Sequence, residues 1–253
     1  MEVNQSPIGK TPRSTILSYL DLADEIRTVF SATPETKKNK IPASYFSMNV
    51  EGGRCECCLG TGLQKIEMNY LPSTFVLCPE CNGNRFKEQI LDIRYNGKNI
   101  KQILDEPITD IISLFENNKK IYSVLECLIN LGIGYLKLGQ MSMNLSGGEA
   151  QRIKLAKALG LYNGGNWLFV LDEPTVGLNE TDIIKFKSVL LDLQNKGNTI
   201  LIIEHNIEFI ASIADYLIDF GLEGGESGGK IVSRGSVGDV IKDKASSWYG
   251  ILG

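Results

Sequence analysis

The fold class follows from one run of residues, Trp167-Leu168-Phe169-Val170-Leu171-Asp172-Glu173-Pro174. Its first five residues are apolar, which is typical of a strand buried in a parallel sheet. A second apolar run spans 199–203, and the helix-like segment between the two runs ends at Gly197. Three more segments have helical periodicity: 121–131, 148–161 and 207–214. Strands that alternate with amphipathic helices predict an α/β fold, with a mostly parallel sheet covered by helices on both faces.

Ionisable side chains follow both apolar runs: Asp172 and Glu173 after the first, Glu204 and His205 after the second. Open α/β sheets bind ligands at the carboxyl ends of their strands. An aspartate there can hold Mg²⁺ through water, and the next glutamate can deprotonate the water that attacks a γ-phosphate. His205 is the only histidine in the chain. By itself it would more often be structural, but beside the other motifs a catalytic role is favoured.

Residues 145–152, Leu-Ser-Gly-Gly-Glu-Ala-Gln-Arg, form a second motif. Ser146 and Glu149 have the spacing of a capping box that opens a helix. Two glycines in a first turn cost about 1 kcal/mol each relative to alanine, so another requirement must favour them. Gly147 and Gly148 would let a phosphate approach the bare N–H groups of the helix N-terminus.

Four cysteines have the spacing of a structural zinc site. Cys55 and Cys58 form one C-x2-C pair, Cys78 and Cys81 form another, and 19 residues separate the pairs. Cys57 is a rival for the first pair, although pairing it with Cys55 leaves one residue between them. Cys127, on an apolar helical face, is most simply a buried thiol.

The region before residue 110 has a different pattern. A helix is predicted at about 14–30 and a surface loop at 37–42. Residues 46–104 predict a small, metal-bound module that is mostly β, with 90–95 as one of its β runs.

The composition is that of an ordinary globular protein: 253 residues, 43% hydrophobic and 22% charged. The net charge of −4 argues against a protein that coats nucleic acid by charge alone. Residues 1–104 nevertheless hold 13 basic and 11 acidic side chains, so a polyanion surface is favoured there. No apolar run has the length of a membrane helix and no signal peptide is recognisable, so we expect a cytoplasmic protein without membrane contact.

Together these motifs resemble the ATP-binding cassette (ABC) ATPases. Within that superfamily they resemble the UvrA family, the damage-sensing ATPases of bacterial nucleotide excision repair. The resemblance covers essentially the whole chain and is carried by 5–14, 52–86, 138–140, 145–154, 171–174, His205 and 224–229.

The resemblance implies a role for each matching residue. Gln5 corresponds to the Q-loop glutamine that senses Mg²⁺ and the γ-phosphate, Asp172 to the Mg²⁺ aspartate, Glu173 to the general base and His205 to the switch histidine. Ser146, Gly147 and Gly148 correspond to the signature residues that close on ATP held by the opposing cassette, and 175–179 to the D-loop. The insert with the four cysteines resembles the zinc module of the second signature domain, which meets DNA in the family.

One family motif does not occur in the sequence, the phosphate loop G-x-x-x-x-G-K-[ST], or Walker A. Its backbone amides and lysine hold the β- and γ-phosphates. We therefore expect negligible ATP turnover by the isolated chain, and poor solubility because an unpaired sheet edge is exposed. The chain resembles roughly the last third of UvrA, from the Q-loop of the second cassette onward. Either another polypeptide supplies the loop, or the chain is a repurposed remnant.

The predicted architecture is an incomplete ABC-type cassette with an inserted small zinc-binding α+β module. Residues 1–12 would be the Q-loop stub, 13–120 the signature-domain insertion with its zinc module at about 46–104, and 121–253 the signature, Walker B and switch-histidine portion.

The leading functional hypothesis is a DNA damage recognition component that uses Zn²⁺ and ATP with Mg²⁺. Its expected partners are damaged double-stranded DNA, a Walker A-bearing UvrA portion or split subunit, a second copy in a UvrA-type dimer, and a UvrB-like protein. Candidate phosphate contacts are Lys65, Arg85 and Lys87. The alternative is a non-catalytic, zinc-dependent DNA-binding module. Residues 58–62, together with Cys55, also resemble one zinc repeat of the chaperone type. Residues 81–84, at the second cysteine pair, do not follow that pattern.

Overall fold

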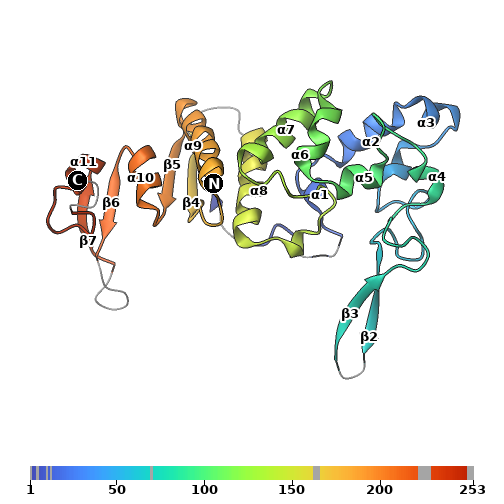
Figure 1. Cartoon of the computed structure of the whole chain (residues 1–253), viewed down its shortest axis with the longest axis horizontal. Coiled ribbons are helices and arrows are strands. Elements are labelled where there is room, and N and C mark those ends of the chain that lie inside the picture. Colours follow the sequence, from blue (N-terminus) through green and yellow to red (C-terminus); the bar gives the residue numbers. More distant parts are fainter. Residues whose placement is uncertain are drawn as a thin grey trace. The chain divides into compact units, whose positions relative to one another are not determined.

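The computed structural model describes residues 2–3, 6–9, 11, 13–68, 71–161, 166–221 and 229–249. The chain forms two compact units, residues 1–201 and 202–253, and each is described by itself (Figure 1). This division differs from the predicted functional boundaries at residues 12 and 120, which stay predictions.

The first unit begins with strand β1 (Glu2–Val3), followed by α1 (Ile16–Tyr19), α2 (Ala23–Ser31), α3 (Pro34–Lys38) and the 3₁₀ helix η1 (Ala43–Phe46). The predicted continuous helix at 14–30 is wrong, because Asp21 adopts a left-handed conformation (φ +56°) between α1 and α2. The predicted loop at 37–42 begins inside α3. Thr33 caps that helix by accepting a hydrogen bond from the Thr36 N–H, and Pro34 suits its first position.

Strands β2 (Leu63–Met68) and β3 (Leu71–Leu77) form an antiparallel hairpin in which Lys65 lies opposite Phe75. Helices α4 (Glu88–Leu91) and α5 (Ile100–Asp105) follow it (Figure 1). The β run predicted at 90–95 is therefore wrong where α4 overlaps it. Ile90 and Ile93 are both buried, and a spacing of three places two side chains on one face of a helical turn rather than of a strand.

A helical core connects this region to the sheet. It comprises α6 (Ile108–Ile111), the 3₁₀ helix η2 (Ile112–Phe115), α7 (Lys119–Asn130), the 3₁₀ helix η3 (Ser142–Asn144) and α8 (Gly147–Leu161). Buried Ile121, Leu125 and Leu128 form one face of α7, which packs against α8 and α9 (Glu180–Asn195). The helices predicted at 121–131 and 148–161 are confirmed.

The sheet has the strand order β1-β4-β5, with β4 at Leu168–Asp172 and β5 at Thr199–Ile203. β1 and β4 are parallel, and Phe169 and Leu171 of β4 are fully buried. Gly197, just after α9, has φ +85° as a helix-ending glycine should. Leu168 and Leu201, however, are 48% and 49% exposed. The described elements thus cover the sheet only in part, in contrast to the predicted cover on both faces.

The second unit contains α10 (Ile207–Ile213), β6 (Leu217–Phe220), β7 (Ile231–Gly235) and α11 (Val237–Val240). β6 and β7 are antiparallel, and Ile210, Val240 and Trp248 form the core of this unit. Buried Asp219 accepts hydrogen bonds from Ser246 Oγ (2.6 Å) and Ser247 N (2.9 Å), which hold the segment after α11 in place. None of the described helices combines the length and the apolar character needed to cross a bilayer.

Candidate metal and nucleotide sites

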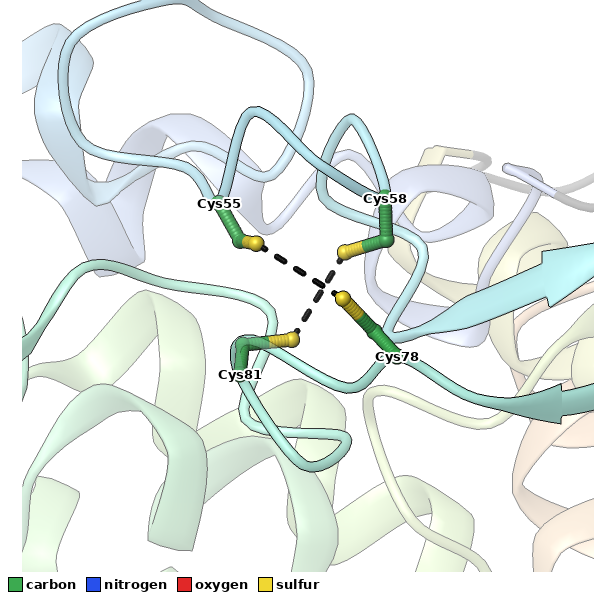
Figure 2. Close-up of side chains that lie close together, drawn as sticks. All are labelled: Cys55, Cys58, Cys78 and Cys81. Carbon is green, nitrogen blue, oxygen red and sulfur yellow. Dashed lines mark hydrogen bonds between the residues drawn. The ribbon is translucent and has the colours of Figure 1, made fainter.

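The structure brings the four predicted cysteines together in one buried group (Figure 2). Cys55 and Cys58 lie in turns before β2, and Cys78 and Cys81 follow β3. The four Sγ atoms all lie within 4.8 Å of one another, with 3.9 Å between Cys55 and Cys78 and 3.6 Å between Cys58 and Cys81. Disulfide sulfurs would be about 2.05 Å apart. A tetrahedral zinc ion with bonds of about 2.3 Å separates its sulfurs by about 3.8 Å, so the cluster has the size of a four-cysteine zinc site.

Backbone groups support the cluster. The Gly62 N–H donates to Cys58 Sγ (3.2 Å), and the Cys78 N–H donates to the Gly62 carbonyl (3.0 Å). Gly60 (φ +82°) passes so close to residue 48 that a Cβ would lie 1.9 Å from the Met48 carbonyl oxygen. This turn therefore requires glycine.

The surroundings of the cysteines change the pKa values of their thiols in opposite directions. Burial alone would raise the pKa of the Cys78 thiol, but the N–H groups of Cys81 and Glu80 lower that pKa to about 6. Burial, together with the neighbouring thiols of Cys58, Cys78 and Cys55, raises the pKa of Cys81 to about 12. Backbone N–H groups thus favour the thiolate at Cys78, whereas burial opposes it at Cys81.

Cys57 packs against these four cysteines but is not one of the group. Its Sγ accepts a hydrogen bond from Gln64 Nε2 (3.0 Å), and the four-cysteine group does not include it. The geometry accordingly favours Cys55 and Cys58 over Cys57 as the first pair.

The signature-like segment opens α8 with the predicted capping box. The Glu149 N–H donates to Ser146 Oγ (3.3 Å), and the Ser146 N–H donates to Glu149 Oε2 (2.7 Å). The same carboxylate accepts a hydrogen bond from the hydroxyl of Tyr135 (2.7 Å). Gly147 and Gly148 thus occupy the first turn of a 15-residue helix.

Asp172 is the last residue of β4, with its side chain exposed, and Glu173 follows it. Glu173 has φ +45°, a left-handed conformation that costs a non-glycine residue about 1–2 kcal/mol. The first turn of α8 lies beside this segment, since a Cβ on Gly148 would lie 3.6 Å from the Val176 carbonyl oxygen. The signature-like turn and the two acidic residues therefore belong to one local structure.

Two other residues were predicted for the nucleotide site, Gln5 and His205. Gln5 lies outside the described residues. His205 lies just after β5, belongs to the second unit and is exposed. Its backbone N–H donates to Glu204 Oε2 (2.6 Å). Asn179, in the D-loop-like segment, caps α9 by accepting a hydrogen bond from the Asp182 N–H (2.9 Å).

The three candidate DNA contacts have different surroundings. Lys65 is half exposed on β2 and forms an ion pair with Glu67 (2.9 Å), and Lys87 is exposed before α4. The Arg85 side chain is only 18% exposed and bonds to Asp105 Oδ1 (3.3 Å) and to the Gly139 carbonyl oxygen (3.0 Å). These contacts occupy the Arg85 guanidinium, whereas Lys65 and Lys87 are more exposed.

Sequence reasoning missed Gln151 and Arg152 as residues of the site. Both are buried on α8, 1% and 4% exposed, and both bond to the backbone around Glu173. Their polar character within an otherwise buried helical face was the available signal, because buried polar side chains need specific partners.

Comparisons with known proteins identify relatives of this chain. The chain is 47% identical over 242 residues to UvrABC system protein A of Micrococcus luteus, an overlap of 96% of this chain and 24% of the relative. UvrABC system protein A of Staphylococcus aureus (strain COL) is 46% identical over 246 residues, an overlap of 97% and 26%. The crystal structure of UvrA2 from Deinococcus radiodurans matches with a TM-score of 0.87 and 40% identity, over 100% of this chain and 31% of that one. No protein-family model matches. The chain spans about a quarter of the length of these curated relatives.

Proposed function

This chain belongs to the UvrA family over nearly all of its own length, and from that premise we propose that it is a DNA damage recognition component of nucleotide excision repair. It would contribute the signature, Walker B and switch-histidine parts of an ABC ATPase, together with a zinc module that meets DNA. The polypeptide that holds the triphosphate would carry the Walker A loop, a motif that does not occur in these 253 residues. Further partners would be damaged duplex DNA, a second copy in a UvrA-type dimer and a UvrB-like protein.

One observation carries the ATPase part of the proposal: the signature-like turn at 146–148 and Glu173 lie on adjacent, hydrogen-bonded segments. In this proposal Asp172 holds Mg²⁺ through water, and Glu173 orients and deprotonates the attacking water. Ser146, Gly147 and Gly148 close on ATP held by the opposing cassette, where the N-terminus of α8 favours negative charge. Gln5 and His205 keep the roles that family membership implies.

The proposed roles of the cysteines and lysines rest on their surroundings. Cys55, Cys58, Cys78 and Cys81 would hold a structural zinc ion that fixes the base of the β2–β3 hairpin. Lys65 and Lys87, near that base, would contact DNA phosphates.

The test of this function is the substitution Glu173→Gln in an ATPase completed by a polypeptide that carries Walker A. ATP should still bind, while hydrolysis falls by about 100-fold or more because the general base is lost. Glu180→Gln, an exposed acid in the first turn of α9, is the matched control and should hydrolyse ATP normally. Unchanged hydrolysis in the Glu173 variant would remove that residue from its role, and rapid turnover by the isolated chain would contradict the need for a second polypeptide.

The second candidate function is zinc-dependent DNA binding without catalysis. It is favoured by Lys65, which is half exposed on β2 of the β2–β3 hairpin. It predicts duplex binding by the full chain that weakens with salt and is lost on zinc removal. Under this alternative the Glu173 substitution changes nothing measurable, which separates the two functions.

A further inference from the structure

Two adjacent side chains of α8 hold the backbone on both sides of Glu173. Gln151 Nε2 donates to the carbonyl oxygen of Asp172 (2.9 Å). Arg152 Nη1 donates to the carbonyl oxygens of Pro174 (3.4 Å) and Val176 (3.2 Å). The acceptors therefore flank the proposed general base, and their donors come from the helix that the signature-like turn opens.

The backbone at Glu173 needs such support. Its left-handed conformation is one that residues other than glycine keep only where their surroundings impose it. The turn that follows has its own hydrogen bonds, from the Val176 N–H to the Glu173 carbonyl (3.2 Å) and from the Leu178 N–H to the Thr175 carbonyl (3.0 Å). These bonds lie within the turn, and the contacts from α8 tie the turn to a helix.

The donors are themselves buried. Gln151 and Arg152 are almost completely buried, so neither can exchange its carbonyl partners for water. Burial lowers the pKa of the Arg152 guanidinium, and the nearby Tyr135 and Glu149 side chains oppose that change. Glu149 in turn belongs to the capping box of α8. Glu149 and Arg152 thus lie near one another on α8, and Arg152 bonds to the backbone that follows Glu173.

We propose that Gln151 and Arg152 are positioning residues that hold Glu173 in its left-handed conformation and join the signature turn and the general base into one rigid piece. This rests on the proposed function.

The first test uses the full chain and needs no ATP hydrolysis. Both Gln151→Met and Arg152→Lys keep most of the side-chain volume. The first removes the amide N–H donor, and the second replaces the guanidinium donors by an ammonium group at a different position. In both variants we expect the Val176 and Leu178 amides to exchange with deuterium about tenfold faster or more, and the Glu173 Cα chemical shift to lose its left-handed value. Amides in the middle of α8 should stay as protected as in the wild type.

Lys157→Met is the matched control on the same helix. Lys157 contacts the Tyr19 carbonyl (2.6 Å) and Asp21 (2.8 Å), away from Glu173, so exchange at Val176 should not change. Circular dichroism identifies a variant that fails to fold, and the milder Gln151→Met then decides. Exchange at Val176 within twofold of the wild type in a folded variant would overturn the proposal.

The second test separates positioning from nucleotide binding in the ATPase completed by a Walker A polypeptide. Arg152→Lys should lower kcat about tenfold and change KM for ATP by less than about threefold. A rise in KM as large as the fall in kcat would overturn the positioning role. Glu173→Gln should abolish hydrolysis without changing exchange at Val176. If that variant hydrolyses ATP normally, the proposed function fails while the exchange result still stands.

Discussion

The sulfurs of neighbouring cysteines have different surroundings in this protein. Cys58 Sγ lies 3.6 Å from Cys81 Sγ in the four-cysteine group, whereas Cys57 Sγ lies beside Gln64. A tetrahedral site that loses one thiolate loses most of its affinity, and its binding free energy also stabilises the fold.

The expected result of Cys58→Ser is the loss of about one bound zinc ion per chain and a lower melting temperature. Cys57→Ser should keep its zinc. Metal analysis of the purified variants, after dialysis against a weak chelator, measures this difference. Loss of zinc from both variants would mean that Cys57 contributes a ligand.

At the scale of elements, helix caps explain where several helices begin. Ser146 opens α8, and Ser236 opens α11 with the same reciprocal contacts, in that case with Asp239. The two caps share their chemistry but lie in different units.

Ser146→Ala should destabilise the protein by about 1 kcal/mol through loss of the cap. Amide exchange should rise in the first turn of α8, where the phosphate of a nucleotide is proposed to bind. Ser236→Ala is the matched control and should raise exchange only at α11. If Ser146→Ala leaves the first turn of α8 as protected as before, the capping box does not hold that turn.

At the scale of the whole molecule, the chain divides into units with separate cores. Asp219 is central to the second unit, because its carboxylate is buried and accepts hydrogen bonds from Ser246 and Ser247.

Asp219→Ala leaves those donors without their acceptor and should cost about 1.5–3 kcal/mol in the second unit. Amide exchange should rise across β6 and β7 while α7, in the first unit, keeps its protection. Glu208→Ala, an exposed acid on α10, should have little effect. A uniform rise in exchange over both units would show that they unfold as one.

Local features of this protein could be predicted from the sequence because their causes are local. The cysteine spacing predicted a group of four thiols, the apolar run ending at Asp172 predicted β4, and Ser146 with Glu149 predicted the start of α8. The strand, the helix start and each cysteine pair depend on residues within a few positions of one another, although 19 residues separate the two cysteine pairs. The run at 90–95 failed as a strand because burial of Ile90 and Ile93 on a helical turn outweighed its β-rich composition.

Contacts between distant segments decided the rest. Arg85 has the residue type of a DNA contact, but its bond to Gly139, 54 positions away, leaves its side chain only 18% exposed. Arg152 could not be recognised as a partner of the Glu173 turn until the chain folded, because it lies 22 positions before Pro174 and in another element. Composition and spacing therefore determine which chemistry the side chains can supply. The tertiary structure determines which side chains are buried, and burial leaves a charged group no stable state except beside a specific partner.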